Sequence, residues 1–121
     1  DFNATGSTEQ KLNYLKLAED AYLRALQIDD RYTRCMYALG VLYVFELDEP
    51  AKAIPYLEKL LTIDTKHIDA MFVLARAYYS TFEFDKAVQM YDKIIATSNS
   101  EETKSNAEAN KKIALEAAYA K

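Results

Sequence analysis

An internal repeat with a period of 34 to 35 residues constrains the fold of this chain more than any other feature. Ala18, Ala53 and Ala87 lie 35 and 34 residues apart. A second series recurs after 35 residues, pairing Met36, Leu39, Gly40 and Tyr43 with Met71, Leu74, Ala75 and Tyr78. Self-similarity at such a period is typical of stacked structural repeats. We place the residue that lengthens one period within 45–50.

Each repeat contains two helical patterns in succession. The apolar residues recur at spacings of three and four, which puts them on one face of a helix. Between the two patterns Asp48 is an N-cap candidate, Glu49 suits an acidic first turn and Pro50 fits the first helical turn, where its missing N–H costs little. Only two Gly and two Pro occur among 121 residues, which disfavours a hairpin-rich β fold. Each repeat is therefore predicted to be a helix hairpin.

The chain is predicted to form a single all-α domain, in which the hairpins stack as a right-handed α-α superhelix. A capping box of Ser7 and Gln10 opens the first helix, which runs to about Ile28. This helix corresponds to the second helix of a hairpin whose first helix is missing. The predicted segments are a disordered lead at 1–8, a half repeat at 9–28, full repeats at 32–66 and 67–99, and a capping helix at 100–120.

These residues resemble the tetratricopeptide repeat (TPR) family, whose unit follows W-x2-L-G-x2-Y and then A-x3-F. The segment 36–43 fits the first part with Met in place of Trp, and 53–57 fits the second with Leu in place of Phe. The segments 71–78 and 87–91 fit in the same way, so the resemblance covers about 14–99. The last helix matches only at Ala109, which makes it a cap rather than a further repeat.

The resemblance implies a non-catalytic scaffold that binds a protein or peptide in a concave groove, because ligands of this family commonly lie along the first helix of each unit. Aromatic side chains and Arg are frequent at interface hot spots. The alternative that these residues pack on one another and bind nothing stays open. The residues that the alignment places on this face are Arg34, Tyr37, Val41, Val44, Phe72, Arg76, Tyr79, Asn106 and Asn110.

Catalytic, metal and cofactor chemistry finds little support in the sequence. There is one His and one Cys, and no glycine-rich phosphate loop. Asp64, His67 and Asp69 lie close together at a hairpin junction, but helix caps explain them better than a metal site does. Cys35 is interpreted as a core residue rather than a reactive thiol. We therefore predict a chain that is not an enzyme and needs no metal or cofactor.

Charge and hydropathy bear on the partners. The net charge of −4 disfavours nucleic acid, and no apolar run approaches the roughly 20 residues that span a bilayer. The Lys and Asn pattern of TPR domains that bind chaperone tails is absent from the groove. The compartment stays unknown: the cytoplasm is slightly favoured, and export fits if a signal was removed.

Self-association is the main alternative to a partner-binding groove. The first helix is apolar almost all round its second half, from Leu15 to Ile28, although its own hairpin partner is missing. Such a stripe is expected to be covered by upstream chain, by another subunit or by a second copy. The alternative function is therefore a structural assembly module, with a homodimer formed through the first helix.

Overall fold

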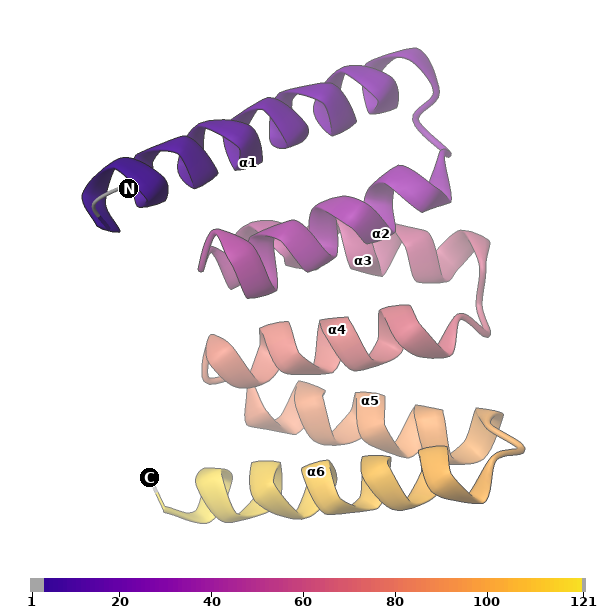
Figure 1. Cartoon of the computed structure of the whole chain (residues 1–121). Helices are drawn as coiled ribbons and strands as arrows, with labels where there is room; N and C mark the ends of the chain where they lie inside the picture. The colour runs from indigo at the N-terminus through magenta and orange to yellow at the C-terminus, as the bar shows by residue number, and fades with distance from the viewer. Residues whose placement is uncertain (1–3, 121) are drawn as a thin grey trace.

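The computed structural model describes residues 4–120, with side chains from Thr8 onward. Within that range the chain is helical and contains no strand. The helices follow one another down a stack, from α1 at the indigo end to α6 at the yellow end (Figure 1). Their bounds are α1 Ala4–Ile28, α2 Thr33–Val41, η1 Leu42–Glu46, α3 Pro50–Ile63, α4 Ile68–Ser80, α5 Phe84–Thr97 and α6 Glu101–Tyr119.

Two hairpins form the centre of this stack, α2 with η1 and α3, followed by α4 and α5. Small residues allow the paired helices to approach closely. Gly40 is the tightest case, because a Cβ built at this position would lie 2.6 Å from Cδ2 of Leu57. Ala53, Ala75 and Ala87 are fully buried. The all-α fold of helix hairpins predicted from the repeat is confirmed, and the small residues of the repeat are its packing contacts.

The core runs continuously along the stack rather than forming a central globule. It contains Tyr43, Tyr78 and Tyr91, which are 3%, 5% and 6% exposed, so these three tyrosines are packing residues. The largest fully buried side chains come from both hairpins: Met36, Leu39, Leu57, Leu60, Met71, Leu74 and Ile94. Stacking is therefore what buries the apolar face of each hairpin.

A π-helical turn, η1, accommodates the extra residue of the longer repeat. The N–H of Leu47 donates to the carbonyl oxygen of Leu42 at 2.9 Å, which closes a loop one residue wider than an α-helical turn. Asp48 and Phe82 then occupy equivalent left-handed positions with φ of 53° and 64°. Since these two are 34 residues apart and Tyr43 and Tyr78 are 35 apart, the extra residue lies between Tyr43 and Asp48.

This geometry corrects one detail of the expected turn. The interval that holds the extra residue, between Tyr43 and Asp48, overlaps the predicted 45–50 stretch. Asp48 is not the N-cap of α3: Glu49 holds that position, without a side-chain cap hydrogen bond, and Pro50 is the first helical residue. The left-handed backbone of Asp48 is what prevents it from capping.

The start of α1 is also corrected. The helix begins at Ala4, so residues 4–8 are not the predicted disordered lead, and Ser7 lies inside the helix rather than opening it in a capping box. The part of that lead at 1–3 lies outside the described residues. Extending an existing helix by one residue costs less than starting a new one, and no Pro interrupts this stretch.

Candidate functional site

The predicted groove residues lie on the first arms of the two hairpins and on the last helix, α6. The Val, Tyr and Phe side chains are half-buried, whereas the two Arg and the two Asn are exposed. By element, α2 contributes Arg34, Tyr37 and Val41, η1 contributes Val44, α4 contributes Phe72, Arg76 and Tyr79, and α6 contributes Asn106 and Asn110.

Tyr37 forms the junction between the two hairpins. Its ring stacks on His67 with centroids 5.2 Å apart. Nδ1 of His67 accepts a hydrogen bond from the N–H of Ala70 at 3.0 Å, so His67 caps α4, as predicted for this junction. Burial, and secondarily the charge of Asp69, raises the pKa of Tyr37, which keeps its phenol protonated. Tyr37 therefore presents a fixed ring edge and a hydroxyl rather than a mobile side chain.

The α4 aromatics are also held by their own hairpin. Phe72 lies 6.4 Å from Tyr91, and Tyr79 meets Phe84 edge to face at 5.3 Å, measured between ring centroids. Burial raises the pKa of Tyr91, and the charge of Arg76 opposes that shift. These contacts fix the rings in place, and rigid aromatic side chains lose little entropy when a partner covers them.

A cavity of about 440 Å³ lies between α1 and α2. It brings two of the predicted groove residues, Tyr37 and Val41, together with the first helix. Its remaining lining is Leu15, Ala18, Tyr22, Ala38, Leu42 and Glu46. Sequence reasoning had assigned the α1 residues to self-association and not to this site. The α1 wall of this cavity could have been found from the repeat alignment, which pairs Ala18 with Ala53 and Tyr22 with Leu57.

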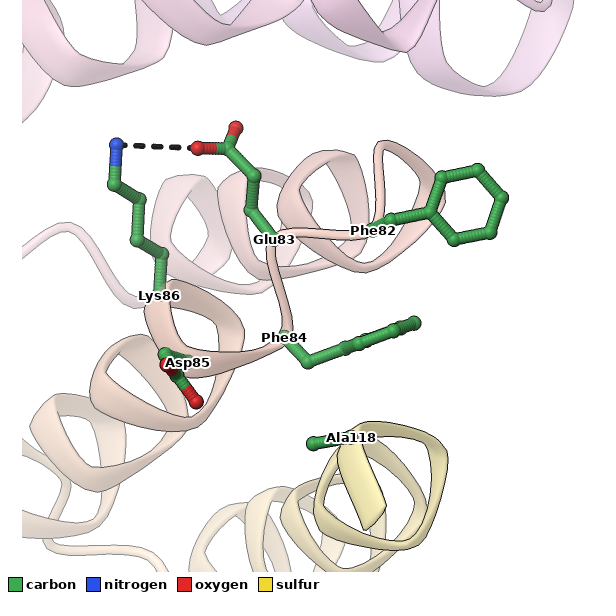
Figure 2. Close-up of a pocket in the computed structure, with 6 residues that line it drawn as sticks. All are labelled: Phe82, Glu83, Phe84, Asp85, Lys86 and Ala118. Atoms are coloured by element: carbon green, nitrogen blue, oxygen red, sulfur yellow. Dashed lines mark ion pairs between the residues drawn. The ribbon is translucent and has the colours of Figure 1, made fainter. Parts of the chain in front are cut away.

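A second cavity of about 340 Å³ lies beside the turn between α4 and α5. Figure 2 shows the Phe82 and Phe84 rings extending to the same side of the turn, with Ala118 of α6 below Phe84. Phe82 is 71% exposed, and its ring centroid lies 6.1 Å from that of Phe84. The ion pair between Lys86 and Glu83, 3.2 Å between Nζ and Oε1, flanks this cavity.

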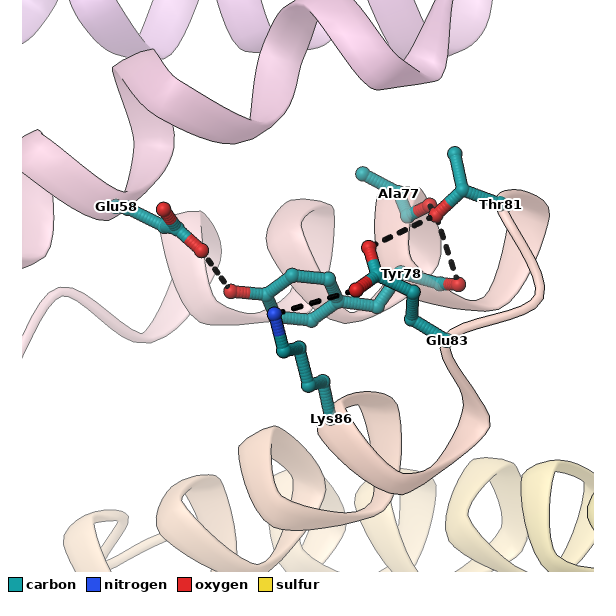
Figure 3. A network of polar contacts seen from close by, with 6 residues as sticks. All are labelled: Glu58, Ala77, Tyr78, Thr81, Glu83 and Lys86. Carbon is teal, nitrogen blue, oxygen red and sulfur yellow. Dashed lines mark hydrogen bonds and ion pairs between the residues drawn. The ribbon is translucent and has the colours of Figure 1, made fainter.

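Buried tyrosines join each hairpin to the helix that precedes it. The hydroxyl of Tyr43 donates to Oε2 of Glu19 on α1 at 2.7 Å. The hydroxyl of Tyr78 donates in the same way to Glu58 on α3 (Figure 3). Burial is the largest cause that raises the pKa of both phenols, and the hydrogen-bonded carboxylates raise it further. Both phenols therefore stay protonated at neutral pH and donate hydrogen bonds that join neighbouring elements.

The described part of the chain contains no group of three or more His, Cys, Asp or Glu side chains that could hold a metal ion. Cys35 is a buried free cysteine, in agreement with its interpretation as a core residue. Among the described helices, none combines the length and apolarity needed to cross a membrane. The predicted groove residues thus comprise half-buried aromatic and Val side chains on α2, η1 and α4 and exposed Arg and Asn side chains on α2, α4 and α6.

Comparison with known proteins agrees with this architecture. The tetratricopeptide repeat family matches residues 44–103, which include α3, α4 and α5. The chain belongs to the tetratricopeptide repeat family. It is also similar to a TPR repeat-containing protein of Borreliella burgdorferi, with 31% identity over 91 residues. That similarity covers 75% of this chain, and the chain spans 40% of the length of the relative.

Proposed function

We propose that this TPR chain binds a peptide or a segment of a partner protein on the face formed by α2, η1, α4 and α6. TPR repeats generally mediate protein–protein interaction and are generally non-catalytic. The observation that carries the proposal is the row of half-buried rings, Tyr37, Phe72 and Tyr79, with exposed Arg76 between them in sequence. Arg and aromatic side chains contribute most to interface affinity.

Exposure at α1 supports a second candidate, an assembly role. Leu12, Tyr14 and Leu17 are 47%, 73% and 63% exposed on this helix. Apolar surface of this kind marks interaction sites when it is contiguous. A homodimer through α1 would place two copies of this stripe against each other, and sedimentation velocity of the wild type and of Leu17→Glu would detect it as a lost dimer.

Affinity recovery of bound proteins from cells that express the full native protein tests the main proposal. The variants Arg76→Glu and Tyr79→Ala change the proposed face, and Lys93→Glu is the matched control because Lys93 is exposed on α5. We expect the wild type and Lys93→Glu to recover a partner protein that Arg76→Glu and Tyr79→Ala recover in smaller amounts. Circular dichroism confirms that each variant is folded. Equal recovery with all four proteins would contradict binding on this face.

A further inference from the structure

The groove between α1 and α2 has an equivalent elsewhere in the molecule, and that equivalent is filled. Thirty-five residues further on, the walls are formed by α3 and α4, and α2 packs against both helices. Ala53, Leu57 and Ala77 line the equivalent positions and are completely buried, and Val73 is 6% exposed. A helix lying in this groove is therefore the arrangement by which the repeat buries its apolar surface.

The groove between α1 and α2 has the same walls without the helix. Ala18, Tyr22 and Ala38 align with Ala53, Leu57 and Val73, yet all three are only half-buried. These three residues line the open cavity of about 440 Å³, and a helix placed as α2 is in the next repeat would lie over it. Its lining is apolar except for Glu46 at one end and the hydroxyls of two tyrosines. The site is thus preformed by the same packing that accepts a helix in the next repeat.

The filled groove also indicates the chemistry of the missing helix. There, α2 approaches closely enough that Gly40 rests directly on Leu57. At the empty groove the larger Tyr22 replaces Leu57, so the incoming helix needs a Gly or Ala at its crossing point. Large apolar residues must flank that small residue at spacings of three and four, as they do in α2 and α4.

We propose that the groove between α1 and α2 is a docking site for an amphipathic α-helix of a partner protein, with a small residue at the centre of its apolar stripe. The occupant lies against α1 and α2 as α2 lies against α3 and α4. This inference rests on the proposed function, and it defines the partner segment as a helix at the α1 end of the surface.

Two features of the chain favour a partner protein over other occupants. The remaining end helix, α6, presents Ser105, Glu108 and Lys112 at the positions where α4 has its apolar stripe, so α6 of a second copy does not fit. An upstream hairpin arm would need a turn just before Leu15, which aligns with the helix starts at Pro50 and Phe84. Instead, α1 continues without interruption back to Ala4.

A direct test uses the full chain and a fluorescein-labelled, acetylated and amidated peptide of residues 67–81, with terminal lysines for solubility. This peptide is the chain's own α4 and carries Ala75 between Leu74 and Tyr78. The control peptide bears Leu74→Asp. Fluorescence anisotropy is measured with wild-type protein, with Ala18→Glu in the groove, and with the matched variant Ala21→Glu on the exposed face of α1. Arg76→Glu is included to report binding on the α4 face.

We expect saturable binding that Leu74→Asp abolishes, that Ala18→Glu weakens by about tenfold or more, and that Ala21→Glu preserves. If Ala18→Glu unfolds the protein, Ala38→Glu tests the opposite wall. Absence of binding, or loss with Arg76→Glu but not with Ala18→Glu, would overturn the inference. After either outcome, weaker recovery of a native partner with Tyr79→Ala than with wild type would still support the proposed function. If the free protein is a dimer and Ala18→Glu dissociates that dimer, the occupant of the groove is a second copy of the chain. That outcome would also overturn the inference of a partner protein.

Discussion

Two turn residues, Asp48 and Phe82, hold the left-handed backbone conformation that side chains other than Gly rarely adopt. Asp tolerates this region because its short polar side chain can bond locally, but a bulky aromatic residue gains no such compensation. Phe82 also buries little surface, since it is 71% exposed and contacts Phe84 only edge to face. The strain at Phe82 is therefore larger than the packing that this ring provides.

Replacing Phe82 is expected to separate the strain from the contact. Phe82→Ala removes the ring and keeps the unfavourable φ, whereas Phe82→Gly removes both. We expect the Gly variant to be more stable than the Ala variant by about 1 kcal/mol, the usual cost of a left-handed residue that carries a Cβ. Urea unfolding followed by circular dichroism measures both free energies of unfolding. Equal stability of the two variants would show that the turn relaxes when the ring is lost.

Successive elements are joined by hydrogen bonds that hydropathy does not reveal. Tyr43 on η1 and Tyr78 on α4 each reach back to a carboxylate on the preceding second helix, Glu19 or Glu58. Glu19 is 9% exposed, and the Tyr43 hydroxyl satisfies its carboxylate. A buried acceptor that loses its donor costs more than an average hydrogen bond contributes. These pairs therefore fix how one hairpin seats on its predecessor, in addition to the apolar contacts.

Tyr43→Phe is expected to lower the free energy of unfolding by about 1 to 3 kcal/mol, because the Glu19 carboxylate stays buried without its donor. Tyr14→Phe is the matched control, since Tyr14 is 73% exposed. Chemical denaturation at pH 7 measures both. A Tyr43→Phe variant as stable as the control would show that Glu19 turns to solvent without cost.

The same pairs predict alkaline sensitivity. The pKa of Tyr43 and Tyr78 is raised in the folded chain, so above pH about 10 the unfolded chain releases these protons first. Their contribution is complete below pH 10 and is lost as the pH rises further. We expect the double variant Tyr43→Phe, Tyr78→Phe to lose less stability than wild type between pH 9 and pH 11. Parallel pH profiles of urea midpoints would contradict this linkage.

How far the sequence predicts these elements depends on the range of the interactions. The hairpins could be predicted because Ala53 and Ala87 repeat one packing position and Gly40 and Ala75 repeat another, and periodicity reports both directly. The π-helical turn could not, because an extra residue near Tyr43 fits a wider helical turn as well as a longer loop. The cavity between α1 and α2 required knowing that Ala18 stays half-exposed, which depends on the absence of a neighbouring helix and not on local sequence.

The two ends of the stack differ in chemistry. At one end α6 packs closely against α5, buries Ala107 and Ala114, and turns Lys112 and Glu108 to solvent. At the other end α1 leaves apolar residues exposed and shares an open groove with α2. Repeat stacks need a polar outer face at each terminus to stay soluble. The two ends therefore differ in packing: α6 buries small residues against α5 while Ile113 and Tyr119 stay exposed, and α1 borders an open groove.

This asymmetry predicts opposite outcomes for trimming the two ends. Deleting 1–13 removes side chains that are all exposed where the structure describes them, at 8–13. Within that described stretch it breaks the ion pair of Lys11 with Glu46, a surface pair worth at most about 1 kcal/mol. We expect its Tm to fall by less than about 5 °C. Deleting 100–121 exposes the face of α5 that α6 covers, and we expect aggregation or loss of a cooperative transition. Thermal scans by circular dichroism with light scattering compare the two. A soluble, cooperatively unfolding chain without α6 would mean that each hairpin is stable without its neighbour, and the stack would then be an array of independent units.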